Sequence, residues 1–424
     1  MRDVIITLVV FGLLPMVLMR PSIGVYLWSW LGYMNPHRLS WGFAYSFPFV
    51  QVVAIVTLAS MIFSKEPKKL PNSPLVVLWA LFVLWMCIAT AVAIDPGHSV
   101  TELSRTLKIQ VMILVTFLLI NDREKLHTLA WVLALSIGFF GIKGGFFTIA
   151  TGGNFRVWGP PGSFIEGNNE LALALIIVMP LFRYLQLTSS NKWVRRGLVL
   201  AMLLCAASIV ASYSRGAFLA GGVMAFMFWL KSRHKFAIGV VGVMIVGAIL
   251  MFLPQQWFDR MSTIENFEED RSAMGRINAW TFAFNLAKDR PLTGGGFDTF
   301  TPELFIKYAP DPTAFHDAHS IYFEILAEQG FVGLGLFLMM WFATYKVAGN
   351  IVRQCKGRDD VTWARDLAAM LQVSMAGYAV GGAFLGLAYF DLPYHIMAMV
   401  AVLHHLMKEK GVMEPQTSSL RGRA

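Results

Sequence analysis

A histidine directly ahead of an apolar run has the clearest potential for acid–base chemistry in this sequence. His319 stands just before the run that begins at Ile321, with Asp317 two residues earlier and His316 before that. An unperturbed imidazole accepts a proton at neutral pH, and a nearby carboxylate can orient it. We interpret His319 as a candidate general base. A helix-terminal histidine satisfied by the backbone is the alternative.

Several arginines are predicted to lie on the same side of a membrane as His319. Arg215 stands between two apolar runs at a predicted membrane boundary, where a guanidinium is costly unless it is paired. A side chain that reaches phospholipid headgroups is the alternative. Guanidinium groups bind phosphate oxygens through paired hydrogen bonds, so several of them near an imidazole indicate a site for a phosphorylated substrate. The further candidates are Arg156, Arg260, Arg271 and Arg276.

Neither a metal nor a cofactor is predicted. The acidic run Glu268–Asp270 has no companion ligand motif, and it offers Arg271 a local partner as an ordinary loop charge. The triplet Gly294–Gly296 lacks the Gly-Lys-Ser/Thr of a phosphate-binding loop, so a turn is expected there. The 3 cysteines suggest neither a disulfide framework nor a thiolate site. Arginines would then take the place of a divalent cation at a pyrophosphate.

The elements that must position these residues are apolar helices. Of the 424 residues, 56% are hydrophobic and only 14% are charged, which is typical of a polytopic membrane protein and not of a soluble domain. Runs of membrane-spanning length recur. The net charge of +9 comes from short basic clusters between these runs, which indicates cytoplasmic links and not a nucleic-acid-binding protein.

The fold class predicted is therefore all-α, with about twelve transmembrane helices and both termini in the cytoplasm. Residues 22–35 are apolar but short and rich in aromatics, so we expect an interfacial or re-entrant segment; if they cross, the N-terminus moves outside. Residues 212–216 are expected to form a hairpin corner, because 197–230 is too long for one crossing. The predicted spans are 4–19, 44–63, 74–94, 105–120, 127–150, 169–187, 197–213, 216–230, 237–253, 321–347, 367–388 and 393–407.

This pattern divides the chain into four regions. Residues 1–253 would form nine membrane helices, 254–320 a large outer loop region, 321–407 three more helices, and 408–424 a disordered cytoplasmic tail. The outer loop region carries Arg271, Arg276 and His319, so the candidate site is expected at the outer face.

Short motifs in order along the chain resemble the O-antigen ligase and polymerase superfamily of membrane glycosyltransferases. They are Ser214-Arg215-Gly216, Gly275-Arg276 with Trp280, Pro291-Leu292-Thr293-Gly294 with Gly296, His319-Ser320 with Tyr322, and Leu326-Ala327-Glu328 with Gly330. Two stretches, 32–39 and 156–170, resemble the subgroup described as exosortase-associated O-glycosylation ligases. One departure is Ser320, where the family often has asparagine.

The resemblance implies a GT-C-like bacterial inner-membrane enzyme whose active site faces the periplasm. It would move a glycan from undecaprenyl pyrophosphate to a hydroxyl of lipid A–core oligosaccharide, with inversion and without a metal. The resemblance gives His319 the role of general base, and it makes Arg215 and Arg276 the clamps on the departing pyrophosphate. Arg156, Arg271 and Asp317 would be further substrate contacts. The expected partners are this donor, this acceptor and membrane lipids, with no nucleic acid.

Three alternatives remain at the level of sequence. A polysaccharide polymerase or a protein O-oligosaccharyltransferase would share the donor and the chemistry but use another acceptor. A transporter of lipid-linked substrates would use the outer arginines as an entry path, but the sequence lacks paired broken helices in corresponding halves.

Overall fold

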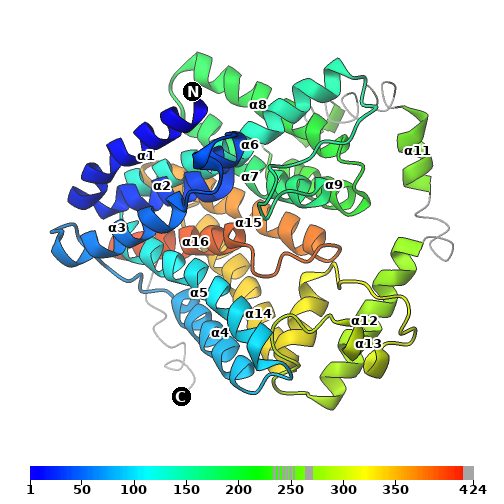
Figure 1. Ribbon diagram of the computed structural model, residues 1–424. Coiled ribbons are helices and arrows are strands. Elements are labelled where there is room, and N and C mark those ends of the chain that lie inside the picture. The colour runs from blue at the N-terminus through cyan, green and yellow to red at the C-terminus, as the bar shows by residue number, and fades with distance from the viewer. Residues whose placement is uncertain are drawn as a thin grey trace, which may run out of the picture.

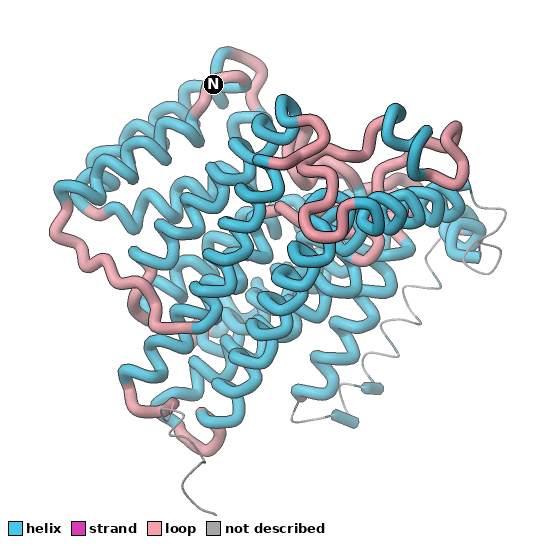
Figure 2. Tube along the Cα trace, turned by 90° about the horizontal axis from the view of Figure 1, so that it is seen from below, coloured by secondary structure: helices cyan, strands magenta, loops and turns pink. Residues whose placement is uncertain are grey.

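The protein is described here from a computed structural model, which covers residues 1–232, 235–236, 239–240, 244, 247, 251, 254–262 and 271–413. Within these residues the chain is built from helices and loops, with no strand (Figures 1 and 2). The helices are α1 (Arg2–Met19), α2 (Pro21–Met34), η1 (Pro36–Leu39), η2 (Phe43–Tyr45), α3 (Phe49–Phe63), α4 (Pro74–Ala91), α5 (Pro96–Leu119), α6 (Arg123–Ala150), α7 (Asn168–Thr188), α8 (Lys192–Val210), α9 (Arg215–Lys231), α11 (Gln255–Ser262), α12 (Arg271–Asp289), α13 (Pro302–Tyr308), α14 (Ile321–Gln354), η3 (Asp359–Val361), α15 (Thr362–Gly382) and α16 (Asp391–Glu409).

Six of the described helices are long and apolar enough to cross a membrane: α1, α4, α6, α7, α8 and α14. α3 is apolar but shorter, and α5 and α15 carry charged residues within their length. The prediction of an all-α polytopic membrane protein is confirmed. Most of the predicted span 237–253 lies outside the described residues, as does the predicted tail from 414 onward.

The helix α2 changes the topology that the sequence predicted. At the start of α1, the Asp3 carboxylate accepts a hydrogen bond from the Gly42 N–H (3.0 Å), shortly before α3 begins. At the other end, the Ser64 hydroxyl, which follows α3, donates to the Met19 carbonyl (3.3 Å). α1 and α3 therefore run in the same direction, and α2 must run back between them. In place of the interfacial or re-entrant segment expected at residues 22–35, the structure has a helix that returns between α1 and α3, which is the other outcome considered from the sequence.

The additional helix places the two termini at opposite ends of the bundle. Lys69, in the link after α3, forms an ion pair with Glu409 at the end of α16 (3.4 Å). The start of α1 lies at the other end of α3, beside Gly42. The prediction of both termini on one face is therefore wrong. The physical reason is that α2 adds one pass through the bundle, so the start of α1 lies at the opposite end from the end of α16. Figure 2 marks the N-terminus at one end of the helices.

A glycine break divides α14 into the segments 321–329 and 331–354. Gly330 has φ 67° and ψ −171°, a region open essentially to glycine alone. The loop that follows α12 docks on this break: the Gly295 N–H donates to the Ala327 carbonyl (2.8 Å), and the Phe331 N–H donates to the Pro291 carbonyl (2.9 Å). The Gly triplet is therefore a turn, as predicted, and the predicted span 321–347 is not one uninterrupted helix.

Replacing Gly330 by alanine is expected to destabilise the protein strongly. The positive φ alone costs on the order of 1–3 kcal/mol for a residue with a Cβ. That Cβ would also lie 2.3 Å from the Leu292 carbonyl oxygen, so the docked loop would have to move. The measurement is the thermal unfolding midpoint in detergent. Gly335→Ala, on the same helix with open space around the new Cβ, is the control, and an equal effect of both substitutions would contradict this account.

Candidate active site

The loop that leads into α14 is fastened to α12. The Asn278 side-chain amide donates to the Asp311 carbonyl (2.8 Å) and to the Ala314 carbonyl (3.0 Å). The Trp280 indole N–H donates to the Ala318 carbonyl (2.7 Å). Each bond gives a partner to a carbonyl that a loop would otherwise leave to solvent. α12 therefore sets the backbone immediately before His319, and Figure 1 shows α12 and α13 beside the first part of α14.

His319 has a left-handed backbone conformation, with φ 41°. This region is uncommon outside glycine, and histidine is one of the residue types that enter it more often than others. The next residue, Ser320, is extended and buried, and it begins α14 as the N-cap. The turn at His319 thus directs the chain from the loop into the helix, and it fixes the imidazole at the N-terminal end of α14.

The His319 imidazole lies among charged and titratable groups. Its ring centroid is 4.9 Å from that of His316, and the charges of Arg276 and Asp317 act on it. Burial is the main cause that lowers the pKa of His319, His316 and Arg276 lower it further, and Asp317 opposes them. His319 is therefore neutral, and able to accept a proton, at neutral pH and somewhat below.

The acid limb of a His319-dependent activity should move when its neighbours are changed. Loss of the His316 charge removes a cause that lowers the pKa of His319, so in His316→Gln the limb should shift to higher pH with the maximal rate kept. Asp317→Asn should shift it to lower pH, because Asp317 raises this pKa. The measurement is the pH profile of kcat/KM. Shifts of the same sign in both variants would contradict the arrangement.

Arg215 is the first residue of α9, in the hairpin corner that the sequence predicted. Ser214 caps the helix by accepting a hydrogen bond from the Ala217 N–H (3.2 Å). The Tyr213 hydroxyl donates to the Gly153 carbonyl (2.7 Å), and the Arg156 guanidinium lies over the Tyr213 ring, 5.9 Å from its centroid. The structure therefore brings Arg156 and the corner with Arg215 together, although they are far apart in sequence.

The end of α15 and the link after it lie between the corner and His319. A Cβ on Gly216 would meet the Phe384 side chain at 2.9 Å, and one on Gly386 would lie 4.0 Å from the His319 Cα. The half-buried Arg276 also interacts electrostatically with Glu170, at the start of α7. The ends of α7, α9, α12, α14 and α15 thus converge on one region. The side chains of Arg260 and Arg271 and the run Glu268–Asp270 lie outside the described part of the structure.

A cavity of about 330 Å³ lies beside Gly386, the residue whose added Cβ would be 4.0 Å from the His319 Cα. Gly386 forms part of its wall, and a Cβ there would lie 3.5 Å from the Glu324 carboxylate. Glu328 is buried in the wall, where it accepts hydrogen bonds from the Tyr389 hydroxyl (2.6 Å) and the Asp298 N–H (3.0 Å). The acidic, cationic and aromatic lining residues are Glu102, Asp298, Glu324, Glu328, Arg105, Phe164, Phe297, Tyr389 and Phe390.

This cavity was not predicted from the sequence. Glu324 and Glu328 are carboxylates within a predicted span, and such residues are functional candidates by default, which was the available signal. They also stand four residues apart on one helix, so they face the same side. The combination of carboxylates with aromatic rings offers hydrogen bonds for hydroxyl groups and flat surfaces for sugar rings.

Two family models match the chain. The model described as O-antigen ligase matches residues 200–338, which contain Arg215, Arg276 and His319. The model described as a family of unknown function (DUF5935) matches residues 1–190. No curated protein matches the sequence. Residues 200–338, less than half of the chain, are therefore similar to the O-antigen ligase family.

Proposed function

We propose that the protein transfers a glycan from undecaprenyl pyrophosphate to an acceptor hydroxyl, with inversion and without a metal, at the periplasmic face of a bacterial inner membrane. The observation that carries this proposal is the position of His319, a half-buried imidazole with a lowered pKa inside the region that is similar to the O-antigen ligase family. Arg276 acts on it electrostatically, and its backbone lies near Gly386, which lines a cavity with carboxyl and aromatic side chains.

The proposed reaction uses His319 as the general base. The imidazole takes the proton of the acceptor hydroxyl while that oxygen attacks the anomeric carbon of the donor glycan. The bond from this carbon to the pyrophosphate oxygen breaks on the opposite face, so the configuration inverts. A pyrophosphate is a good leaving group whose departure needs charge stabilisation more than a proton.

Arginines are assigned to the pyrophosphate. Arg276 and Arg215 would stabilise the negative charge that develops on the leaving group, with Arg156 as a further contact beside the Arg215 corner. Arg271 is proposed as a further substrate contact on the basis of the sequence alone. Asp317 would raise the basicity of His319, since its charge acts to raise that pKa.

The cavity beside His319 is assigned to the acceptor. Its carboxyl and aromatic side chains suit the hydroxyl groups and ring of a sugar, and guanidinium groups suit the pyrophosphate. This favours the arginine side for the donor and the cavity for the sugar whose hydroxyl reacts. The proposed acceptor is a hydroxyl of lipid A–core oligosaccharide. A polymerase would place the growing glycan in the same cavity, and a protein O-oligosaccharyltransferase would place a serine or threonine there.

The same proposal covers topology. If the basic links are cytoplasmic, the ends of α7, α9, α14 and α15 that carry the site face the periplasm, and the start of α1 lies on that side too. The C-terminus would then be cytoplasmic. Labelling a cysteine introduced at position 1 or 2 with a membrane-impermeant reagent in intact spheroplasts tests this orientation, and protection of that cysteine would reverse it.

The test is transfer by the purified protein in detergent. Undecaprenyl-pyrophosphate glycan is supplied with lipid A–core, with no added acceptor, or with a serine-containing peptide, each with and without EDTA. Glycosylated lipid A–core in both buffers is the expected result. Elongation of the donor without an acceptor would instead make the protein a polymerase, and a glycosylated peptide would make it a protein glycosyltransferase. Loss of transfer in EDTA would overturn the metal-independent mechanism.

A further inference from the structure

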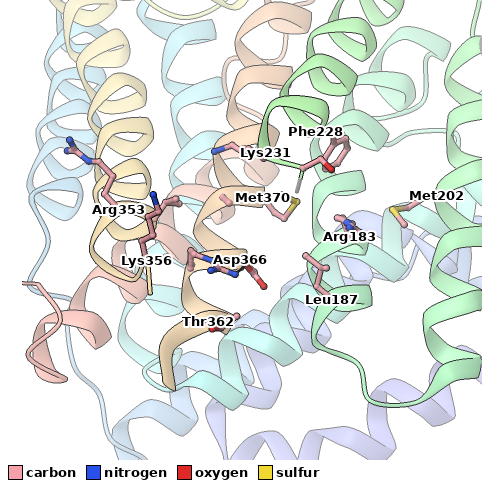
Figure 3. A pocket seen from close by; sticks show the side chains of 14 residues that line it. Arg183, Leu187, Met202, Phe228, Lys231, Arg353, Lys356, Thr362, Asp366 and Met370 are labelled. Carbon is pink, nitrogen blue, oxygen red and sulfur yellow. Dashed lines mark hydrogen bonds and ion pairs between the residues drawn. The ribbon is translucent and has the colours of Figure 1, made fainter. Parts of the chain in front are cut away.

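A second and larger cavity lies at the opposite end of the same helices (Figure 3). Its volume is about 820 Å³. It is bounded by the last turns of α7, α9 and α14, by the first turns of α15, and by Met202 on α8. These are the ends next to the basic links, away from His319. The cavity is therefore separate from the candidate active site.

The polar part of this cavity is strongly cationic. Arg183, Lys231, Arg353, Lys356 and Arg365 line it, and Asp366 is the one carboxylate among the lining residues. Asp366 is already engaged with Arg365 (2.9 Å). Lys231 donates to the Gln372 side-chain oxygen (2.8 Å), so its ammonium is held at the wall. The cavity thus has an uncompensated positive charge that suits an anionic group.

The other part of the lining is apolar. Figure 3 shows the side chains of Leu187, Met202, Phe228 and Met370 around the same space as the cations. A free anion would contact only the cationic part. A ligand with an anionic head and a hydrocarbon chain would contact both, and it would approach from the lipid between helices.

Basic residues at the cytoplasmic ends of membrane helices are common, and their ordinary role is contact with bulk headgroups. Two features distinguish this group. The cations come from four helices or their links and line one cavity, and Arg183, Lys231 and Arg365 are only half exposed or less. A diffuse basic rim requires neither a cavity nor cations withdrawn from solvent.

We propose that this cavity binds a phosphate-bearing lipid, with the phosphate on Arg183, Lys231 and Arg365 and an acyl chain against Met202 and Phe228. Basic pockets between helices on the cytoplasmic side are suited to anionic headgroups. A lipid headgroup and free phosphate both present a phosphate anion, as a monoanion or a dianion, to these cations. The apolar lining favours the lipid.

The lipid would also hold together the helices that build the outer site. α9 carries Arg215 at one end and Lys231 at the other, and α7 carries Glu170 and Arg183 in the same way. A headgroup that bridges the inner ends therefore restrains the outer ends of the same helices. Binding itself does not depend on the proposed function; only an effect on transfer does.

The test uses the full-length protein, delipidated in detergent, with three probes: phosphatidylglycerol, phosphatidylcholine and inorganic pyrophosphate. Native mass spectrometry measures retained lipid, and thermal unfolding measures stabilisation. Phosphatidylglycerol is expected to bind and raise the midpoint, with phosphatidylcholine far weaker. In the double variant Arg183→Gln, Lys231→Gln, its affinity should fall roughly 25-fold, at about fivefold for each cation removed.

Lys192→Gln is the matched control, since Lys192 is an exposed cation at the same end of the bundle that does not line the cavity. It should leave binding unchanged. Equal retention of phosphatidylglycerol by the wild type and the double variant would overturn the site. Equal stabilisation by pyrophosphate alone would overturn the assignment to a lipid. Both readouts work without any transfer assay. A failure of the proposed glycan transfer can therefore be distinguished from a failure of this lipid site.

Discussion

Glycan transfer is expected to fall by about 10²- to 10⁴-fold when His319 is replaced by asparagine, the range that a lost general base typically costs. Asparagine tolerates a positive φ, so this substitution removes the imidazole and keeps the turn with φ 41° that begins α14. Alanine at this position would combine a chemical change with backbone strain. The measurement is the initial rate of transfer by the purified variant at saturating donor.

The matched control is His316→Gln, in which the neighbouring imidazole 4.9 Å away is removed. It should keep most of the activity, with only the shift in pH dependence described above. Thermal unfolding and donor binding should be near the wild-type values for both variants. If His316→Gln lost the activity and His319→Asn kept it, the base would be His316. If both kept it, neither imidazole would take the acceptor proton.

Replacing Arg276 by alanine is expected to lower the rate by about 10²- to 10³-fold, as for the loss of one preorganised donor to a developing charge. Arg276→Lys should recover only part of this, because an ammonium keeps the charge but not the paired hydrogen bonds of a guanidinium. Arg276 also lowers the pKa of His319, so its loss raises that pKa. The rates should therefore be compared near pH 8, where the imidazole is neutral in every variant.

Lys288→Ala, an exposed cation on the same helix α12, is the control for general loss of positive charge. Arg215→Ala should lower the transfer rate about as much as Arg276→Ala if both arginines act on the pyrophosphate. The fold-loss of rate in the double variant should then be much smaller than the product of the two single losses. Unchanged transfer in either single variant would remove that arginine from the site. A donor analogue whose leaving group is shorter than a pyrophosphate offers a second readout. The rate of transfer from this analogue should fall less in both arginine variants.

The sequence alone determined the fold class and provided the candidates for the reactive residues. Apolar runs of spanning length dictate helices, because a membrane leaves the backbone no other partners. The basic residues at the ends of these apolar runs identified the links between the helices. Arg276 and His319 were chosen as candidates because a guanidinium can bind phosphate oxygens and an imidazole can accept a proton at neutral pH.

Only the tertiary structure decided which residues meet. Residues 22–35 are too short to be recognised as a crossing from hydropathy, and the contacts of α1 with the residues flanking α3 fix their direction. Glu324 and Glu328 became part of a cavity only because the link after α15 and the loop at Asp298 fold against them. Contacts between segments tens of residues apart depend on helix packing, which has no local signature in sequence. The chemistry of this site was therefore readable from its residue types, and its shape was not.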